Sequence, residues 1–177
     1  FSHRYNSSLD MRFDDKDDSL TAQEIIENSS VRDLTNIFNE FGEERNSFRI
    51  ARAIKESNEE INADTLVNII SRKTAYKYRI KTYSRIFQAL RIKTNNELDH
   101  LESFLNDFMH FLNPGGRIVI ISYHSMEDRM VKHKFKDLKL NKELQVLSKK
   151  PFTPTDEEIF DNKRSRSAKM RVGEKIG

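Results

Sequence analysis

The chain has 177 residues, with 31 Lys and Arg against 28 Asp and Glu and a hydrophobic share of 36%. This length suits one domain, or one core with a small subdomain, and twelve Phe leave enough apolar surface for that core. The lack of Cys excludes a disulfide scaffold and a cysteine-ligated zinc site. No apolar run approaches the roughly 20 residues that span a bilayer, so we expect a soluble protein. The first residue is Phe1 rather than Met, and we expect the chain to belong to a longer product.

Two helix starts are predicted after a polar loop at 1–18. Thr21 is followed at the third position by Glu24, and Ser30 is followed in the same way by Asp33. This is the spacing of a capping box, in which each side chain of the pair bonds the other residue's backbone N–H. The sequence therefore predicts two successive short helices at this point.

Further helices are predicted up to residue 112. A third helix at 43–59 is expected to turn three apolar residues inward: Phe48, Ala51 and Ile54. A fourth is short and contains the apolar stretch 66–70. Residues 83–112 continue in helical spacing, with a break near Asn95. We expect the first four helices to form a compact helical unit.

The last third of the chain contains strand patterns. The turn at Pro114–Gly116 leads into a strand at 117–123, which is apolar on both faces, as in the interior of a sheet that helices cover. A helix follows at 125–138. The segments 143–149 and 167–175 are predicted to pair as antiparallel strands at a sheet edge. This order indicates the second half of an α/β fold with a helical insertion.

Polar residues follow the predicted strand at 117–123. His124 and Ser125 resemble parts of a catalytic group, but neighbours in sequence do not place a nucleophile against its base. The simpler interpretation makes Ser125 the N-cap of the next helix, with Asp128 at the third position. His124 can still face a cleft, because ligands of open α/β sheets bind beyond the carboxyl ends of strands. No second His stands at ligand spacing, so we expect no metal site.

Three basic clusters raise the prospect of an RNA partner. Arg45, Arg49 and Arg52 have the spacing of one helical face, which is either a phosphate-binding stripe or a solvated surface. The stretch 76–85 interleaves Tyr with Lys and Arg, a composition that suits base stacking or a solvated linker. The stretch 163–171 is also basic and is either an RNA contact or an edge strand protected by charge.

No glycine-rich turn follows an early strand, so the residues show no phosphate or dinucleotide cradle. The Pro-Gly-Gly turn comes before its strand and not after it.

Five blocks follow one another along the chain: FSHRYNSSLDMRFD at the start, FGEERNSFRIARAI, FQALRIKTNNEL, LNPGGRIVIISYHSMEDRMVK and RSRSAKMRVGEK. Together, in this order, they resemble the bacterial RsmH/MraW family. Members of this family are S-adenosylmethionine-dependent methyltransferases that modify the N4 amine of one cytidine in 16S ribosomal RNA. The chain departs from the family pattern in SYHSMEDR, where Phe and Leu are usual, and in LDMRF, where LDMRM is usual.

The resemblance implies a partial class I (Rossmann-like) methyltransferase sheet with an inserted all-helical domain. Residues 1–20 and 83–177 would form the second half of the methyltransferase domain, and residues 21–82 the insertion. The cofactor, S-adenosylmethionine, would bind residues upstream of Phe1, with no cofactor-binding residue in this chain. We therefore expect the chain alone to be inactive.

The resemblance also implies roles for single residues in a direct displacement, in which the amine attacks the methyl group of a sulfonium. Asp10 and Arg12 would lie on the cleft floor, and His124, Ser125 and Asp128 on the side of the target base. The residues expected to contact RNA are Arg45, Arg49, Arg52, Arg79, Arg164 and Arg166.

The implied partner is the 16S rRNA of the small ribosomal subunit in the cytoplasm, with no metal and no membrane. The sequence decides neither for nor against a homodimer. Two other classes also stay open: a non-catalytic RNA-binding module, and a structural remnant of such an enzyme.

Overall fold

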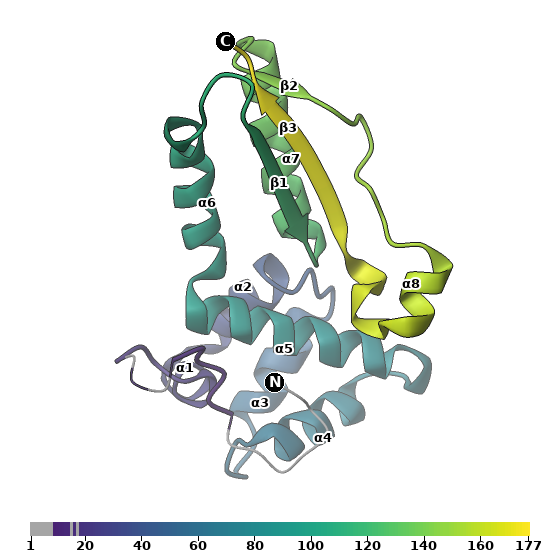
Figure 1. Cartoon of the computed structure of the whole chain (residues 1–177). Helices are drawn as coiled ribbons and strands as arrows, with labels where there is room; N and C mark the ends of the chain where they lie inside the picture. Colours follow the sequence, from purple (N-terminus) through teal and green to yellow (C-terminus); the bar gives the residue numbers. More distant parts are fainter. Residues whose placement is uncertain (1–8, 15, 17) are drawn as a thin grey trace. The chain divides into compact units, whose positions relative to one another are not determined.

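The computed structural model describes residues 9–14, 16 and 18–177, so part of the predicted loop at 1–18 lies outside the described residues. The chain divides into two compact units, Phe1–Glu97 and Leu98–Gly177 (Figure 1). We call them the helical unit and the sheet unit. Among the described residues, no helix is both long and apolar enough to cross a bilayer. The predicted division at 1–20, 21–82 and 83–177 stays a prediction.

The described part of the helical unit consists of helices joined by short turns. They are α1 (Ala22–Asn28), α2 (Val31–Glu40), α3 (Ser47–Lys55), α4 (Ala63–Lys73), the 3-10 helix η1 (Tyr76–Tyr78) and α5 (Arg79–Asn95). Both predicted capping boxes are present, with Thr21 and Glu24 at the start of α1 and Ser30 and Asp33 at the start of α2. These two helix starts are confirmed.

The core of the helical unit is built from one apolar face of each helix. The residues that are fully buried include Leu34, Phe38, Ile50, Leu66, Ile70, Ile86 and Leu90. The prediction for Phe48 is wrong, because its side chain is 60% exposed. The third helix begins at Ser47 and not at residue 43, and its buried stripe runs through Ser47, Ile50, Ala51 and Ile54. Phe48 lies one position off that stripe and therefore faces solvent.

The predicted break after the long fifth helix is confirmed. Asn96 ends α5 in the left-handed conformation, with φ of 47°, and α6 (Glu97–Asp107) begins directly after it. Asn tolerates this conformation better than most residues because its short side chain makes local hydrogen bonds. The helical spacing therefore continues along the chain while the helix itself is interrupted at Asn96.

The sheet unit alternates helices with strands. After α6 come the 3-10 helix η2 (Phe108–Phe111), β1 (Arg117–Ser122), α7 (Ser125–Leu140), β2 (Leu144–Val146), α8 (Asp156–Asp161), the 3-10 helix η3 (Lys163–Ser167) and β3 (Lys169–Lys175). The helix α7 lies against one face of the sheet (Figure 1). A small core forms there from Leu105, Phe108, Val131, Phe135, Leu138 and Leu144. The chain is therefore α/β, as predicted.

The strands are ordered β1-β3-β2, and β3 is antiparallel to both of its neighbours. The predicted pairing of β2 with β3 is confirmed, although β3 lies in the middle of the three strands and not at an edge. Because β1 and β2 both oppose β3, they run parallel to each other. A Cβ at Gly173 would lie 2.6 Å from Leu144 Cδ2, so a larger residue at this position of β3 would displace the buried Leu144 side chain.

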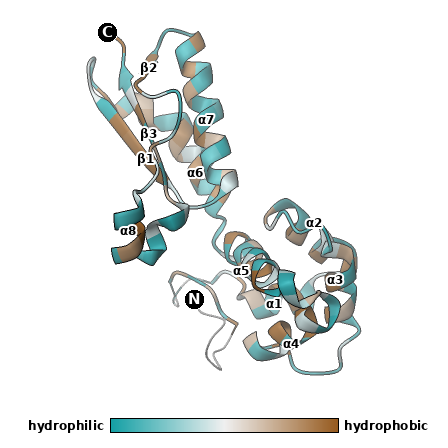
Figure 2. Cartoon of the chain, turned by 90° about the vertical axis from the view of Figure 1, so that its right-hand side faces the viewer, coloured by the Kyte–Doolittle hydropathy of each residue, from teal (hydrophilic) through white to brown (hydrophobic). Residues whose placement is uncertain are grey.

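The strand β1 has one covered and one open face among the described residues. Ile118 and Ile120 pack on the core of the sheet unit, whereas Val119 and Ile121 are 52% and 53% exposed. Figure 2 colours this strand as hydrophobic. The expectation of a strand covered on both faces is wrong within this chain, because no described helix packs on the second face.

Candidate functional site

The segment Leu9–Phe13, which contains the predicted Asp10 and Arg12, has an uncommon backbone. Leu9 and Met11 are buried in the core of the helical unit, at 2% and 5% exposure. Met11 has φ of 63°, a left-handed conformation that costs on the order of 1–2 kcal/mol for a residue with a side chain. A strained backbone at a candidate site persists only where its surroundings hold it.

Hydrogen bonds from two helices hold this segment. The first turn of α1 donates from Ala22 N to Asp10 O, at 2.8 Å, and from Gln23 N to Leu9 O, also at 2.8 Å. Asn95 donates from Nδ2 to Met11 O at 2.9 Å and accepts from Phe13 N at 2.8 Å. Sequence reasoning assigned Asn95 only to a helix break. An Asn at a helix end is the only signal in the sequence for this anchoring role.

Asp10 and Arg12 come together as a bidentate pair. Arg12 Nε lies 2.7 Å from Asp10 Oδ1, and Arg12 Nη2 lies 2.9 Å from Asp10 Oδ2. The hydrogen bonds from Arg12 lower the pKa of Asp10 below its ordinary value, although partial burial acts in the opposite direction. Asp10 is therefore a carboxylate at neutral pH, suited to accepting hydrogen bonds rather than to storing a proton.

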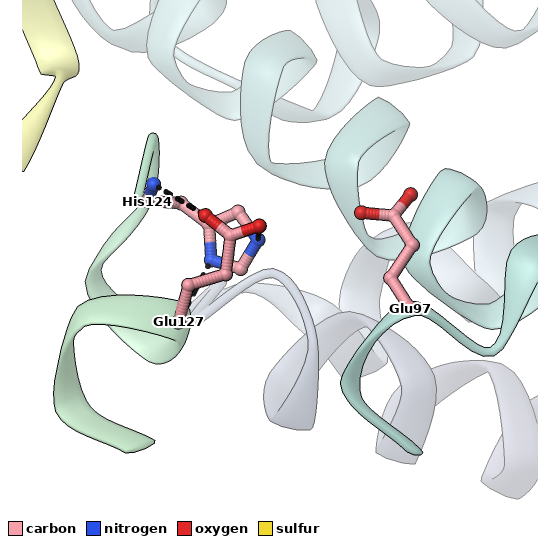
Figure 3. Close-up of side chains that lie close together, drawn as sticks. All are labelled: Glu97, His124 and Glu127. Carbon is pink, nitrogen blue, oxygen red and sulfur yellow. Dashed lines mark hydrogen bonds and ion pairs between the residues drawn. The ribbon is translucent and has the colours of Figure 1, made fainter. Parts of the chain in front are cut away.

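The junction of β1 and α7 is capped by a different pair from the one predicted. His124, not Ser125, is the N-cap of α7, and Glu127, not Asp128, closes the capping box (Figure 3). Glu127 Oε2 accepts from Tyr123 N at 2.8 Å and from His124 N at 3.2 Å. The prediction was one residue late because Ser is the more frequent cap, whereas His caps here through its ring nitrogen.

The ring of His124 is held in place by this cap. Its Nδ1 accepts from Glu127 N at 3.4 Å, and its Nε2 lies 3.3 Å from Glu127 Oε1. With Nδ1 accepting, the neutral ring carries its proton on Nε2. Ser125 occupies the first helical position of α7 and is exposed. Glu97, also drawn in Figure 3, belongs to the helical unit. There its Oε1 accepts from Arg91 Nε at 2.7 Å.

Asp128 is part of an ion pair inside the sheet unit. Its carboxylate accepts from Arg171 Nε at 2.7 Å and from Lys169 Nζ at 3.4 Å, and its side chain is 12% exposed. Burial would raise the pKa of Asp128, but the hydrogen bonds and charges of Arg171 and Lys169 outweigh it and lower the pKa. Sequence reasoning did not predict Arg171 as a partner, because 43 residues separate the two.

The predicted arginine stripe is only partly on a helix. Arg49 and Arg52 are exposed on α3, and Arg52 Nε pairs with Glu56 at 2.7 Å. Arg45 lies before α3, in the turn that follows α2, so the three do not share one helical face. Arg45 instead lines a cavity with Lys81 and Arg85 of α5.

The remaining predicted RNA contacts lie on two different elements. Arg79 begins α5, where its Nε donates to Thr74 O at 3.2 Å and its guanidinium lies 5.6 Å from the centre of the Tyr76 ring. Arg164 and Arg166 are exposed on η3 of the sheet unit. Arg166 also lines an open cavity of about 370 Å³ beside Phe160.

The described residues do not fit S-adenosylmethionine as a cradle. A nucleoside-binding turn between a strand and a helix needs close backbone approach, which glycine provides. The chain has five Gly, at 42, 115, 116, 173 and 177, and none follows a strand and opens a helix. At the turn from β1 to α7, the residue before the helix is His124, whose side chain caps the helix.

Comparison with known proteins identifies the family. The family model described as the MraW methylase family matches residues 1–176. A protein of Trichodesmium erythraeum named ribosomal RNA small subunit methyltransferase H is 46% identical over 99% of this chain and 62% of its own length. Proteins of the same name from a Nostoc and a Cyanothece species are 48% and 45% identical, with 58% and 59% of their lengths covered. The chain spans about three-fifths of these curated relatives, and it belongs to the MraW methylase family.

Proposed function

We propose that this chain is part of an S-adenosylmethionine-dependent methyltransferase that modifies the N4 amine of a cytidine in 16S rRNA of the small ribosomal subunit. One observation carries the proposal: the family match extends from residue 1 to residue 176, and relatives near 46% identity are named rRNA small subunit methyltransferase H. In this proposal the chain supplies the RNA-contacting side of the enzyme.

The three strands are proposed to be one side of a larger Rossmann-like sheet, with the helical unit as an insertion. The order β1–α7–β2 supports this, because two parallel strands joined through a helix are the repeating unit of such sheets. A second support is the open apolar face of β1, at Val119 and Ile121. Parallel sheets are normally covered on both faces.

The cofactor is proposed to bind outside the described residues, and its sulfonium supplies the methyl group. The residues of this chain are then proposed to hold the target nucleotide. Rate gains of this kind come from alignment, since a positioned amine needs no strong base to attack an activated methyl group.

Asp10 and His124 are the residues proposed for that alignment, each within its own unit. Asp10 is an ionised acceptor, fixed by Arg12 on a strained and anchored segment. The ring of His124 is fixed by Glu127, which donates from its N to Nδ1 and lies 3.3 Å from Nε2. Asp128 is proposed to act at a distance, by fixing the first turn of α7 through Arg171.

A chimera tests the proposed function. The matching 58% of the Nostoc relative is replaced by this chain, and the purified chimera is incubated with small ribosomal subunits and isotope-labelled S-adenosylmethionine. We expect label on the N4 amine of one cytidine, located by mass spectrometry of the digested rRNA. A folded chimera that binds the cofactor and transfers no methyl group contradicts the proposal and favours the non-catalytic RNA-binding module.

Two variants at one position separate chemistry from capping. Asn is a good N-cap, so His124→Asn keeps the start of α7 while it removes the imidazole. In the chimera, we expect both His124→Asn and His124→Ala to lower turnover at least tenfold, while only His124→Ala loses stability, by about 1 kcal/mol. Unchanged turnover in a folded His124→Asn variant removes His124 from the site.

A further inference from the structure

A basic cavity lies in the helical unit between the turn that precedes α3 and the first turns of α5. Its volume is about 430 Å³, and it is lined by Glu44, Arg45, Asn46, Tyr78, Lys81, Thr82 and Arg85. The volume is within the range of small-ligand sites, roughly 300–1,000 Å³. We call it the α3–α5 pocket. All of its lining residues belong to one compact unit.

The turn that precedes α3 packs closely against α5, the helix that carries Lys81, Thr82 and Arg85 of the α3–α5 pocket. A Cβ at Gly42 would lie 2.7 Å from Arg85 O, so only glycine allows this approach. Gln88 Nε2 donates to Phe41 O at 3.2 Å on the same side. Glu43, which follows, has φ of 49°, a left-handed backbone conformation. The cations of the turn and of α5 are therefore held together before any ligand binds.

The pocket carries a positive charge that its own carboxylate does not cancel. Glu44 is buried, accepts from Asn46 N at 2.9 Å, and lies 3.5 Å from Arg85 Nη1. It fixes Arg85 and neutralises one of three cations. Within the described part of the chain, Arg45 and Lys81 form no ion pair. Two unneutralised cations at one open pocket are suited to a phosphate.

Polar and aromatic groups surround these cations. Asn46 is the N-cap residue of α3, yet its side chain makes no capping hydrogen bond, so its amide is available to a ligand. Tyr78 lines the pocket at 55% exposure, and Lys77 Nζ lies 4.9 Å from the centre of its ring. Tyr78 is also the N-cap of α5, where no side chain caps the helix. An uncapped helix start adds partial positive charge to the site.

We propose that the α3–α5 pocket binds one unpaired nucleotide of an RNA strand. Arg45 and Lys81 hold its phosphate, Tyr78 stacks on its base, and Asn46 contacts the base edge. Unpaired bases stack on aromatic side chains, whereas bases inside a duplex are not accessible to them. This inference rests on the proposed function, which identifies the bound polymer as RNA. It adds a second RNA-binding site, separate from the site of the reacting cytidine.

Binding of a labelled RNA to the 177-residue chain tests the proposal. The probe is a fluorescein-labelled single-stranded RNA 12-mer, and fluorescence anisotropy gives Kd at several salt concentrations. We expect Tyr78→Leu to weaken binding about tenfold, the loss typical of one base stacking on an aromatic ring. We expect Lys81→Gln to weaken binding about fivefold and to reduce the slope of log Kd against log salt by about one.

Matched controls are available in the same chain. Lys93→Gln makes the same charge change at an exposed position near the end of α5, and Phe111→Leu removes an aromatic ring at 83% exposure in the sheet unit. Both are expected to stay within about twofold of the unmodified chain, on the same probe. Circular dichroism of each variant checks that the helices are intact.

Several results overturn the proposal. They are equal effects of Lys81→Gln and Lys93→Gln, no effect of Tyr78→Leu, duplex RNA that binds as tightly as the single strand, or a folded chain that binds no RNA. None of these results depends on methyl transfer. Failure of the proposed function has a different signature, which is a chimera that binds RNA and cofactor without transferring a methyl group.

Discussion

The helical unit and the sheet unit differ in how completely they bury their apolar residues. In the helical unit each amphipathic helix turns its stripe inward, and residues such as Phe38 and Leu66 are fully buried. Among its exposed aromatic side chains, Tyr78 lies beside Lys77 and Tyr76 lies beside Arg79. In the sheet unit, Val119 and Ile121 lie on a strand with one open face. A helical stripe needs one partner surface, whereas a buried strand needs two.

The largest change in the free energy of unfolding is expected in the fully buried core of the helical unit. Phe38→Ala should lower the free energy of unfolding by about 3–5 kcal/mol, because it removes a fully buried ring and leaves a cavity. Urea unfolding followed by circular dichroism measures this. Phe48→Ala is the matched control, since Phe48 is 60% exposed, and we expect a change within about 0.5 kcal/mol. Similar losses in both variants would contradict the burial that distinguishes this unit.

We expect the next largest effect at the buried ion pair of the sheet unit. Asp128→Asn leaves Arg171, which is 9% exposed, without its carboxylate, and we expect a loss of about 3 kcal/mol. Hydrogen exchange of peptides from α7 and β3 reports the change locally. Asp137→Asn, an exposed carboxylate on the same helix, should change stability by less than about 0.5 kcal/mol. Equal protection of these peptides against hydrogen exchange in the two variants would contradict a stabilising role for the Asp128–Arg171 ion pair.

Acid should abolish the difference between the unmodified chain and Asp128→Asn. The folded-state pKa of Asp128 is lowered, by Arg171 and Lys169 against the opposing effect of burial. Its stabilisation is therefore complete above the ordinary Asp pKa of about 3.9 and is lost as the pH falls through the lower folded-state pKa. Unfolding free energies measured from pH 6 down to pH 2 should converge below pH 4. If the difference in unfolding free energy between the unmodified chain and Asp128→Asn grew in acid, the lowered pKa of Asp128 would be contradicted.

The open face of β1 gives a test that compares the chain with the chimera. In the chain, Ile121→Ala should cost less than about 0.5 kcal/mol, because the side chain is 53% exposed. In the chimera, where we propose that this face is covered, the same change should cost about 2 kcal/mol or more. Thermal unfolding of both pairs measures it. Equal small losses in chain and chimera would mean that the face stays open.

The smallest effect is expected at a helix cap. Ser30→Ala removes the side chain that accepts from Asp33 N, and we expect α2 to lose about 1 kcal/mol. Ser84→Ala, at an exposed position inside α5, should be neutral or slightly stabilising, because Ala favours helix interiors. Urea unfolding measures both. A cap variant as stable as the control would show that the capping box contributes nothing.

Local rules predicted the parts of the fold that depend on local interactions. The boxes at Thr21 and Ser30, the break near Asn95 and the pairing of β2 with β3 all follow from residues close in sequence or from strand pattern. The start of α3 was missed, because the turn at Gly42 depends on close contact with α5. The cap of α7 was shifted by one residue, because a His that caps looks like a catalytic His in sequence.

The candidate sites were harder to predict than the fold because they are assembled from distant residues. Asp10 and Arg12 were found in sequence, but their anchor Asn95 is more than 80 residues away. Asp128 was found and its partner Arg171 was not. The basic stretch at 76–85 was recognised by composition, yet only the structure brings Lys81 and Arg85 beside Arg45. The roles expected for Asp10 and Arg12 on the cleft floor, and for His124, Ser125 and Asp128 on the side of the target base, stay predictions.

One pair of calorimetric titrations tests the central claim, which is that this chain supplies the RNA side of a methyltransferase and not its cofactor site. Single-stranded RNA and S-adenosylmethionine are titrated separately into the 177-residue chain. We expect saturable binding of the RNA and no saturable binding of S-adenosylmethionine. Saturable binding of S-adenosylmethionine would contradict this claim and would place the cofactor on residues of this chain, with Asp10 and His124 the first to examine.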